Sequence, residues 1–262
     1  MVEITPGEMG ELRGDTSTGV TLSSTALLFP LKNARYISFT PRNFVTAVVA
    51  RIAVNPLLVV LKTIDALATA PTNYSSEAQD GDTATDVTLS SLPTAANNGF
   101  IYVGMDRPIR GLRADMDLAN SNASVLTGKY WNGTAWVDIS LTNGTISGGT
   151  TTFGQDGDIT WTVPTAWRKA ALMEIGDSRV PFRHANTPLY WVRLQVSAAL
   201  DASTTLNSLM PLAPSTAYYE LPLGTTDTWA FDRGSAGSLE ALVDAGSGQL
   251  LIDYGRIAGG NF

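Results

Sequence analysis

The 262-residue chain contains no cysteine and only one histidine, His184. The absence of cysteine excludes disulfide bonds, thiolate nucleophiles and the common structural zinc sites. A single histidine cannot make a histidine-ligated metal site, and in a Ser-His-Asp triad it would have to contact both an acid and a serine. His184 lies in a polar segment and the chain has no G-x-S-x-G motif, so we expect a non-enzymatic protein.

The chain also lacks an excess of basic residues and a long hydrophobic run. Its formal net charge is -7, which argues against a nucleic-acid partner because phosphate binding needs a basic face. The longest apolar region, residues 44–62, is interrupted by Arg51 and by Asn55-Pro56, whereas a membrane-spanning helix needs about 20 apolar residues in a row. The N-terminus shows no basic or apolar stretch typical of a signal peptide. We therefore expect no nucleic-acid partner, no membrane partner and no signal peptide.

What is present is a pattern of β-strands. Apolar residues occupy both odd and even positions of Thr46–Val54 and Leu57–Ile64, as in strands that are buried on two faces. A helix is the alternative for residues 44–54. Gly111–Leu118 alternates strictly, which indicates a half-exposed strand. Further strands are predicted at Tyr36–Thr40, Phe100–Gly104, Val125–Trp131, Ala135–Leu141, Asp158–Val163, Leu189–Val196, Ala217–Leu221, Thr228–Phe231 and Gln249–Tyr254.

Helix signals are few. Pro164–Met173 is predicted as a short helix with Thr165 as its N-cap, and Leu239–Val243 as one further turn. The predicted fold is all-β: a jelly-roll-like antiparallel β-sandwich with few short helices. Residues 1–22 are polar and small, and are expected to form an extended N-terminal arm that reaches a neighbouring subunit. Residues 23–262 are expected to form one sandwich domain, and the glycine-rich tail 256–262 to dock like the arm.

The segment GKYWNGTAWVDIS, residues 128–140, predicts a hairpin with a two-residue turn at Asn132-Gly133, in which both residues take positive φ. Strand parity places Tyr130 and Trp131 on opposite faces. In LYWVRLQV, residues 189–196, Trp191 shares a face with Arg193 and Gln195, so we expect Trp191 on a polar surface or at an interface. Aromatic rings stack on sugars, and the alternative is that they pack in a core. Candidate contacts to a glycan or to another protein are Tyr130, Trp136, Trp191 and Arg193.

Two groups of acidic residues are candidate chemical sites. Asp115 and Asp117 share a strand face, and are interpreted as a solvated face with a glycosidase carboxylate pair as the alternative. Asp80, Asp82 and Asp86 are spaced like oxygen ligands of calcium, but the full twelve-residue loop pattern is missing. We therefore expect no cofactor and no metal, with a calcium ion near Asp80 to Asp86 as the open alternative.

Four segments in order carry a resemblance to a known family. They read FIYVGMDRPIRGLRADMDLAN, GKYWNGTAWVDIS, GDITWTVPTAWRK and PLYWVRLQVSAAL, within residues 100–200. This succession resembles a module of structural proteins of tailed bacteriophages, with its "YWNG..W" hairpin and "LYWvRl" strand. Ile109 departs from that pattern, which has an aromatic residue after the proline.

The resemblance implies a non-enzymatic virion protein with a jelly-roll-type module. Its expected location is the virion and its expected partners are other virion proteins, bound by a homo-oligomer that decorates the capsid or serves as a head or tail accessory component. The alternative is a carbohydrate-binding module of a phage fibre or baseplate that recognises a host surface glycan. Residues outside 100–200 carry no part of the resemblance.

Overall fold

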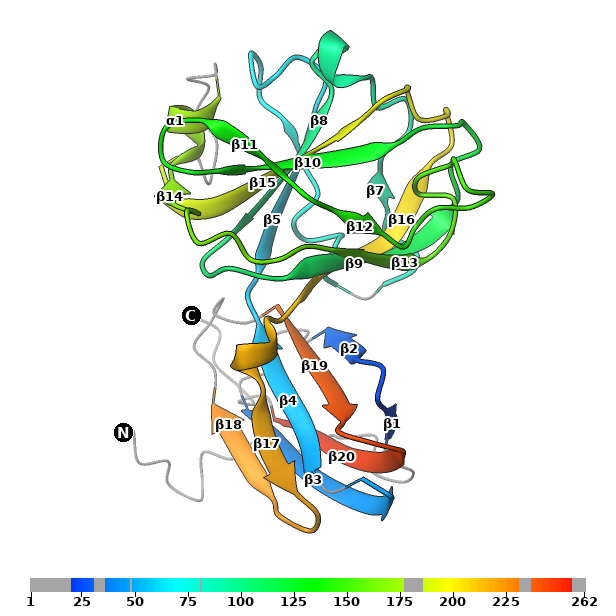
Figure 1. Ribbon diagram of the computed structural model, residues 1–262, viewed down its shortest axis with the longest axis vertical. Helices are drawn as coiled ribbons and strands as arrows, with labels where there is room; N and C mark the ends of the chain where they lie inside the picture. Colours follow the sequence, from blue (N-terminus) through cyan, green and yellow to red (C-terminus); the bar gives the residue numbers. More distant parts are fainter. Residues whose placement is uncertain are drawn as a thin grey trace, which may run out of the picture. The chain divides into compact units, whose positions relative to one another are not determined.

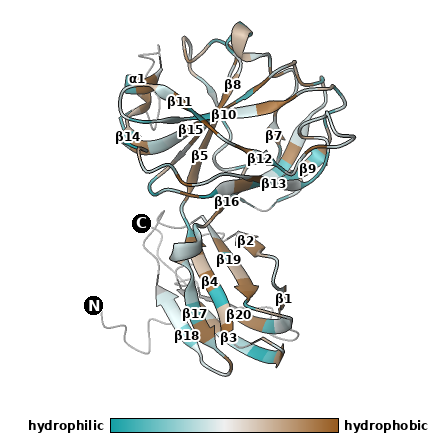
Figure 2. Cartoon of the chain, in the orientation of Figure 1, coloured by the Kyte–Doolittle hydropathy of each residue, from teal (hydrophilic) through white to brown (hydrophobic). Residues whose placement is uncertain are grey.

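The computed structural model describes residues 20–30, 36–47, 49–80, 82–176, 186–230 and 237–255. Several sequence predictions fall outside these ranges: residues 1–19 of the predicted arm, His184, and the tail 256–262. Within them, the prediction of an all-β sandwich with few short helices is confirmed, because the strands form four antiparallel sheets. Figure 1 shows these sheets, and Figure 2 shows apolar residues concentrated on strands such as β5 and β19.

The chain divides into two compact units where the sequence predicted a single sandwich domain. Unit 1 combines residues 1–55 with residues 215–262, and unit 2 comprises Pro56–Pro214. Unit 2 is therefore an insertion in the sequence of unit 1. The Asn55-Pro56 step, which interrupts the longest apolar region of the sequence, is the point where the chain passes from one unit to the other. The strands on its two sides pair with different partners.

Unit 1 is a sandwich of two four-stranded sheets. The first sheet has the order β1 (Val20–Ser23), β20 (Ser247–Gly255), β3 (Tyr36–Val45), β18 (Asp227–Ala230). The second has the order β17 (Tyr219–Pro222), β4 (Val49–Asn55), β19 (Ser238–Val243), β2 (Leu27–Pro30). Both sheets contribute apolar side chains to one core, among them Phe39, Ile52, Leu239 and Ile252.

Two sequence predictions are corrected in unit 1. The predicted arm ends too late, because Val20 and Leu22 belong to β1, which pairs with β20, and the Leu22 side chain is fully buried. The predicted helical turn at Leu239–Val243 lies in β19, between β2 and β4. In both places pairing with a distant strand decides the local structure, and a single sequence does not show which strands meet.

Unit 2 packs a seven-stranded sheet against a five-stranded sheet. The larger sheet has the order β11 (Trp136–Ile139), β10 (Leu126–Trp131), β15 (Leu189–Val196), β8 (Phe100–Met105), β5 (Leu58–Thr63), β6 (Thr72–Asn73), and β14 (Lys169–Ala170) also pairs with β15. The smaller has the order β12 (Thr142–Asn143), β13 (Gly157–Thr160), β9 (Gly111–Leu118), β16 (Thr205–Leu212), β7 (Val87–Thr88). The chain changes sheet between β8, β9 and β10, as it does in jelly-roll sandwiches.

Among the residues that the structure describes, helix is confined to short pieces: α1 (Leu172–Ile175) and the 3₁₀ turns η1 (Ala95–Asn97) and η2 (Ser215–Ala217). The predicted helix over Pro164–Met173 is wrong except for its last two residues, which open α1. The Trp167 indole N–H donates to the Trp191 carbonyl, and the Arg168 backbone N–H donates to the Trp131 carbonyl. These bonds tie the segment to β15 and β10, and it forms a turn at residues 165–166 in place of a helix. Tertiary contacts thus override a weak helical propensity.

Candidate functional site

The hairpin of β10 and β11 has a longer loop than predicted. Trp131 and Trp136 face each other in the register, which leaves residues 132–135 as a four-residue loop. The Asn132 side-chain carbonyl accepts hydrogen bonds from the backbone N–H groups of Thr134 and Ala135, at 2.9 and 2.8 Å. Of the two predicted turn residues, only Gly133 has positive φ, at 103°. The Asn132 side chain closes the loop in place of a tight backbone turn.

The larger sheet has two apolar faces. Its inner face meets the smaller sheet in the main core, which includes Val60, Val103 and Val192. Its outer face carries the neighbours of those residues along each strand, because side chains of a strand alternate. A second core of unit 2 lies on that outer face; it consists of Val59, Leu61, Leu67, Phe100, Tyr102, Ala170, Leu172, Ile175, Leu189 and Trp191.

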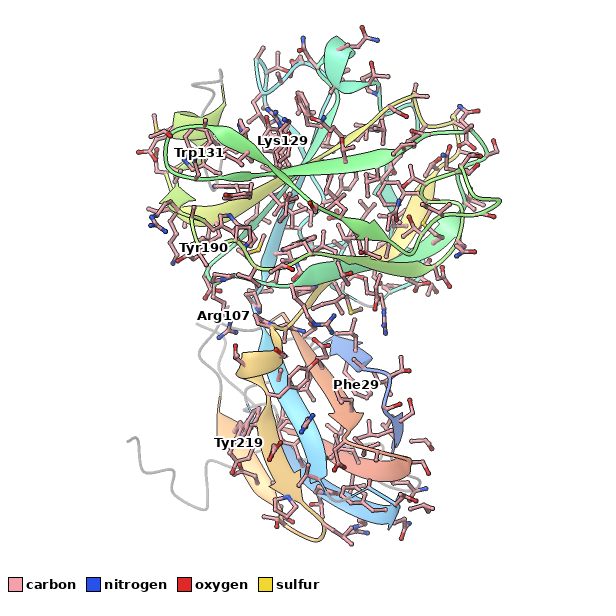
Figure 3. All side chains as sticks on the ribbon, in the orientation of Figure 1. Phe29, Arg107, Lys129, Trp131, Tyr190 and Tyr219 are labelled. Carbon is pink, nitrogen blue, oxygen red and sulfur yellow. The ribbon has the colours of Figure 1, made fainter. Side chains whose placement is uncertain are left out.

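Tyr130 lies on the inner side. Its half-buried ring packs against the main core and meets the Trp167 ring edge-to-face at 6.4 Å between centroids. Trp131 packs against the outer core and meets Trp136 edge-to-face at 5.6 Å. The prediction that Tyr130 and Trp131 point to opposite faces is confirmed. Tyr130 therefore cannot join Trp136 in one aromatic platform, and Trp131, which Figure 3 labels on β10, takes that place.

The prediction that Trp191 lies on a polar surface or at an interface is wrong. The Trp191 side chain is 0% exposed. The indole N–H donates to the Ala170 carbonyl of β14 at 2.8 Å. The alternation of side chains along the strand correctly predicted that Trp191 and Arg193 share a face. Over Trp191, however, that face is covered by apolar residues of β14 and α1. A strand pattern reports which face a residue occupies and not what lies above that face.

The part of the outer face around Arg193 combines charge with aromatic rings. The Arg193 guanidinium lies over the Phe100 ring at 4.4 Å and over the Trp136 ring at 4.8 Å from the ring centroids. Trp136 also donates its indole N–H to the Ile175 carbonyl at 3.3 Å. Two of the four predicted contact residues, Trp136 and Arg193, are thus brought together by the fold.

Next to Arg193 lies an ion pair. Lys129 is the cross-strand neighbour of Arg193, and its ammonium pairs with the Asp138 carboxylate at 2.5 Å. Sequence reasoning missed Phe100 and Lys129 as members of this cluster. Lys129 could have been found, since it has the parity of Trp131 in the hairpin. Phe100 could not, because its place beside Arg193 depends on the pairing of β8 with β15.

The acidic residues of β9 lie elsewhere in unit 2. Burial, followed by repulsion from Asp156, raises the pKa of the Asp115 carboxyl, while a hydrogen bond with Asn207 opposes the rise. Asp117 accepts a hydrogen bond from the Thr205 hydroxyl at 2.8 Å. Each acid thus has its own partner on β16.

The loop considered for calcium uses its carboxylates locally. Asp80 accepts from the backbone N–H of Asp82 and from the Thr85 hydroxyl, both at 2.8 Å, and Asp82 accepts from the Ala84 N–H. Within the ranges that the structure describes, no group of three or more histidine or acidic side chains is placed to hold a metal ion. The same ranges contain no helix of the length and apolarity needed to cross a membrane.

Comparisons with known proteins add no identification. No protein-family model matches the chain, and no curated protein matches it.

Proposed function

We propose that this chain is a non-enzymatic structural protein of a tailed-phage virion, which forms an oligomer and binds other capsid or tail proteins as a capsid-decorating or head or tail accessory component. The observation that carries the proposal is the use of the aromatic residues in the two motifs that resemble the phage module. Trp131, Trp136 and Trp191 pack into one core, and Trp136 and Trp191 donate their indole N–H groups to backbone carbonyls. Aromatic rings that pack in a core and hydrogen-bond to the backbone stabilise the fold, and this supports a structural role for the protein.

An open edge of unit 1 supports assembly. β17 and β18 end their sheets, and no other described strand pairs with their outer sides. Tyr219 and Leu223, at this edge, are 50% and 55% exposed, and the Tyr219 ring lies edge-to-face with Trp229 at 5.6 Å. Figure 3 labels Tyr219. Unpaired edge strands beside exposed apolar side chains favour pairing with another chain, and we assign a second copy as the first partner.

Light scattering over a concentration series tests this assignment. We expect the wild type to form a defined oligomer and Leu223→Glu to lower its mass. Leu118→Glu is the matched control, because Leu118 is also half-exposed but lies in unit 2. A wild type that stays monomeric at every concentration contradicts the oligomer.

The virion assignment is tested separately. Mass spectrometry of purified particles of the phage that encodes the chain should find it in a fixed ratio to the major capsid protein. Its absence from intact particles would refute the assignment.

Glycan binding is the second candidate, and one observation favours it. Trp136 and Arg193 meet on the outer face of the larger sheet, where both side chains remain partly exposed. An aromatic ring beside a hydrogen-bond donor is the arrangement that sugar-binding faces use.

A further inference from the structure

Among the described residues, Arg193 is the charged side chain that has a buried polar atom without a hydrogen-bond partner. Its Nε atom is buried and has no hydrogen-bond partner. No hydrogen bond or ion pair joins its guanidinium to any described residue. A guanidinium carries five N–H donors and a permanent charge, and buried polar groups in proteins are nearly always paired. An arginine left in this state suggests a partner that binds from outside.

The guanidinium is held in place although it has no hydrogen bonds. Phe100 and Trp136 lie against it at 4.4 and 4.8 Å, and stacking of this kind fixes the plane of the group. Phe100 is itself buried in the outer core, and Trp136 is tied to the Ile175 carbonyl. A fixed guanidinium loses little entropy when it binds, which favours affinity.

The charge around Arg193 selects the sign of its partner. Along the register the row of charges runs Asp138, Lys129, Arg193. Asp138 neutralises Lys129 through their ion pair, so the row keeps one uncompensated positive charge, on Arg193. That excess is local, since the whole chain carries -7. Of the three Arg193 nitrogens only Nε is buried without a partner, so the terminal nitrogens form the accessible end. An end of this shape pairs best with a planar oxyanion such as a carboxylate.

Neighbouring side chains suit a sugar on the same face. Thr127 and Gln195 are cross-strand partners one residue pair beyond Lys129 and Arg193 on that face, and neither is buried. Their hydroxyl and amide groups can exchange hydrogen bonds with sugar hydroxyls. Trp131 and Trp136 border the other side with half-buried rings.

We propose that Arg193 is the anion-binding residue of a site for a carboxylated sugar, such as a uronic or sialic acid of a surface glycan. The terminal N–H groups of Arg193 donate to the sugar carboxylate, Thr127 and Gln195 contact its hydroxyls, and Trp136 holds the arginine in position. This proposal rests on the glycan-binding candidate and adds to it the chemical class of the sugar.

The experiment compares acids with their neutral counterparts. Glucuronate, galacturonate and N-acetylneuraminate are titrated into the full chain, each against its methyl ester, while tryptophan fluorescence and the ¹⁵N–¹H signal of Arg193 Nε are followed. We expect the acids to shift the Arg193 signal and to bind about 10- to 100-fold more tightly than the esters, as expected for a hydrogen-bonded charge pair. Arg193→Lys and Arg193→Met should lose that preference, and Arg107→Lys, an exposed arginine of the same unit, should keep it.

Three other outcomes would each overturn the assignment of Arg193 to a sugar carboxylate. Equal binding of acids and esters would leave the glycan-binding candidate standing and remove the role of Arg193. Binding of neither would remove both. Loss of the oligomer in Arg193→Met, without any effect of sugars, would assign Arg193 to a protein contact instead. The Arg193 signal of the wild type answers the question even if both variants fail to fold.

Discussion

The ring of Trp191 occupies the space that a side chain at residue 104 would need. A Cβ atom placed on Gly104 would lie 2.6 Å from Cζ3 of Trp191, and the two residues are cross-strand partners of β8 and β15. Gly104 of the YVG segment therefore packs directly against Trp191 of the LYW segment, although the two residues lie 87 positions apart (191 minus 104) in the sequence.

Gly104→Ala should destabilise the protein. The added methyl group overlaps a fully buried ring, and overpacking of this kind costs about 1–3 kcal/mol of unfolding free energy. Urea unfolding measures the loss. In a double-mutant cycle with Trp191→Leu, the combined loss should be smaller than the sum of the single losses, because the smaller side chain makes room for the methyl group. Strictly additive losses would show that the two residues do not compete for this space.

Asn132→Ala should weaken the β10–β11 hairpin. The Asn132 carbonyl accepts from Thr134 and Ala135 N–H groups and from the Thr134 hydroxyl, and its removal should cost about 1 kcal/mol. Asn132→Asp is the control, since a carboxylate accepts the same bonds. Thermal unfolding followed by tryptophan fluorescence compares the three proteins. An Asp variant as unstable as the Ala variant would argue against a role for the accepted bonds.

Asp201 should make the stability of unit 2 depend on pH. Burial alone would raise the pKa of this carboxyl, but hydrogen bonds from Ser121, Thr204 and Ser203 outweigh it and hold the pKa well below the usual range. The folded pKa is thus lower than the unfolded value of about 3.9. The resulting stabilisation is complete above the unfolded pKa and is lost as pH falls through the folded pKa.

Asp201→Asn tests this linkage. At pH 7 the variant should unfold at a lower urea concentration than the wild type, and the difference should shrink as the pH falls below about 4. Asp138→Asn is the control, because Asp138 is 85% exposed and such surface ion pairs contribute about 0–1 kcal/mol. A gap between Asp201→Asn and wild type that is the same at pH 7 and at pH 3 contradicts the assignment.

Unit 2 should fold when it is expressed alone as residues 56–214. Both of its cores and all of its strand pairs lie within that range. We expect the fragment to give a cooperative thermal transition and the dispersed amide spectrum of a folded β protein. A fragment with a molten spectrum would mean that unit 2 depends on unit 1. The two units would then be compact parts of the structure that do not fold independently.

Several features of this protein were readable from the sequence. Alternation in Gly111–Leu118 and the double apolar parity of residues 57–64 gave β9 and β5 close to their observed bounds, because side-chain period is a local property of a strand. The same periodicity separated Tyr130 from Trp131. The sequence therefore determined the class of fold and most of its strands.

Only the tertiary structure decided what covers each face and which distant strands meet. The burial of Trp191 depends on Ala170, Leu172 and Ile175. The first two of these lie within the segment that the sequence predicted as a helix, and Ile175 follows it. The division at Asn55-Pro56 depends on β4 pairing with β17 and β19, and β5 with β6 and β8. The contact of Arg193 with Phe100 depends on the order of β15 and β8. Non-local pairing is set by the packing of the whole chain, and no local pattern in one sequence encodes it.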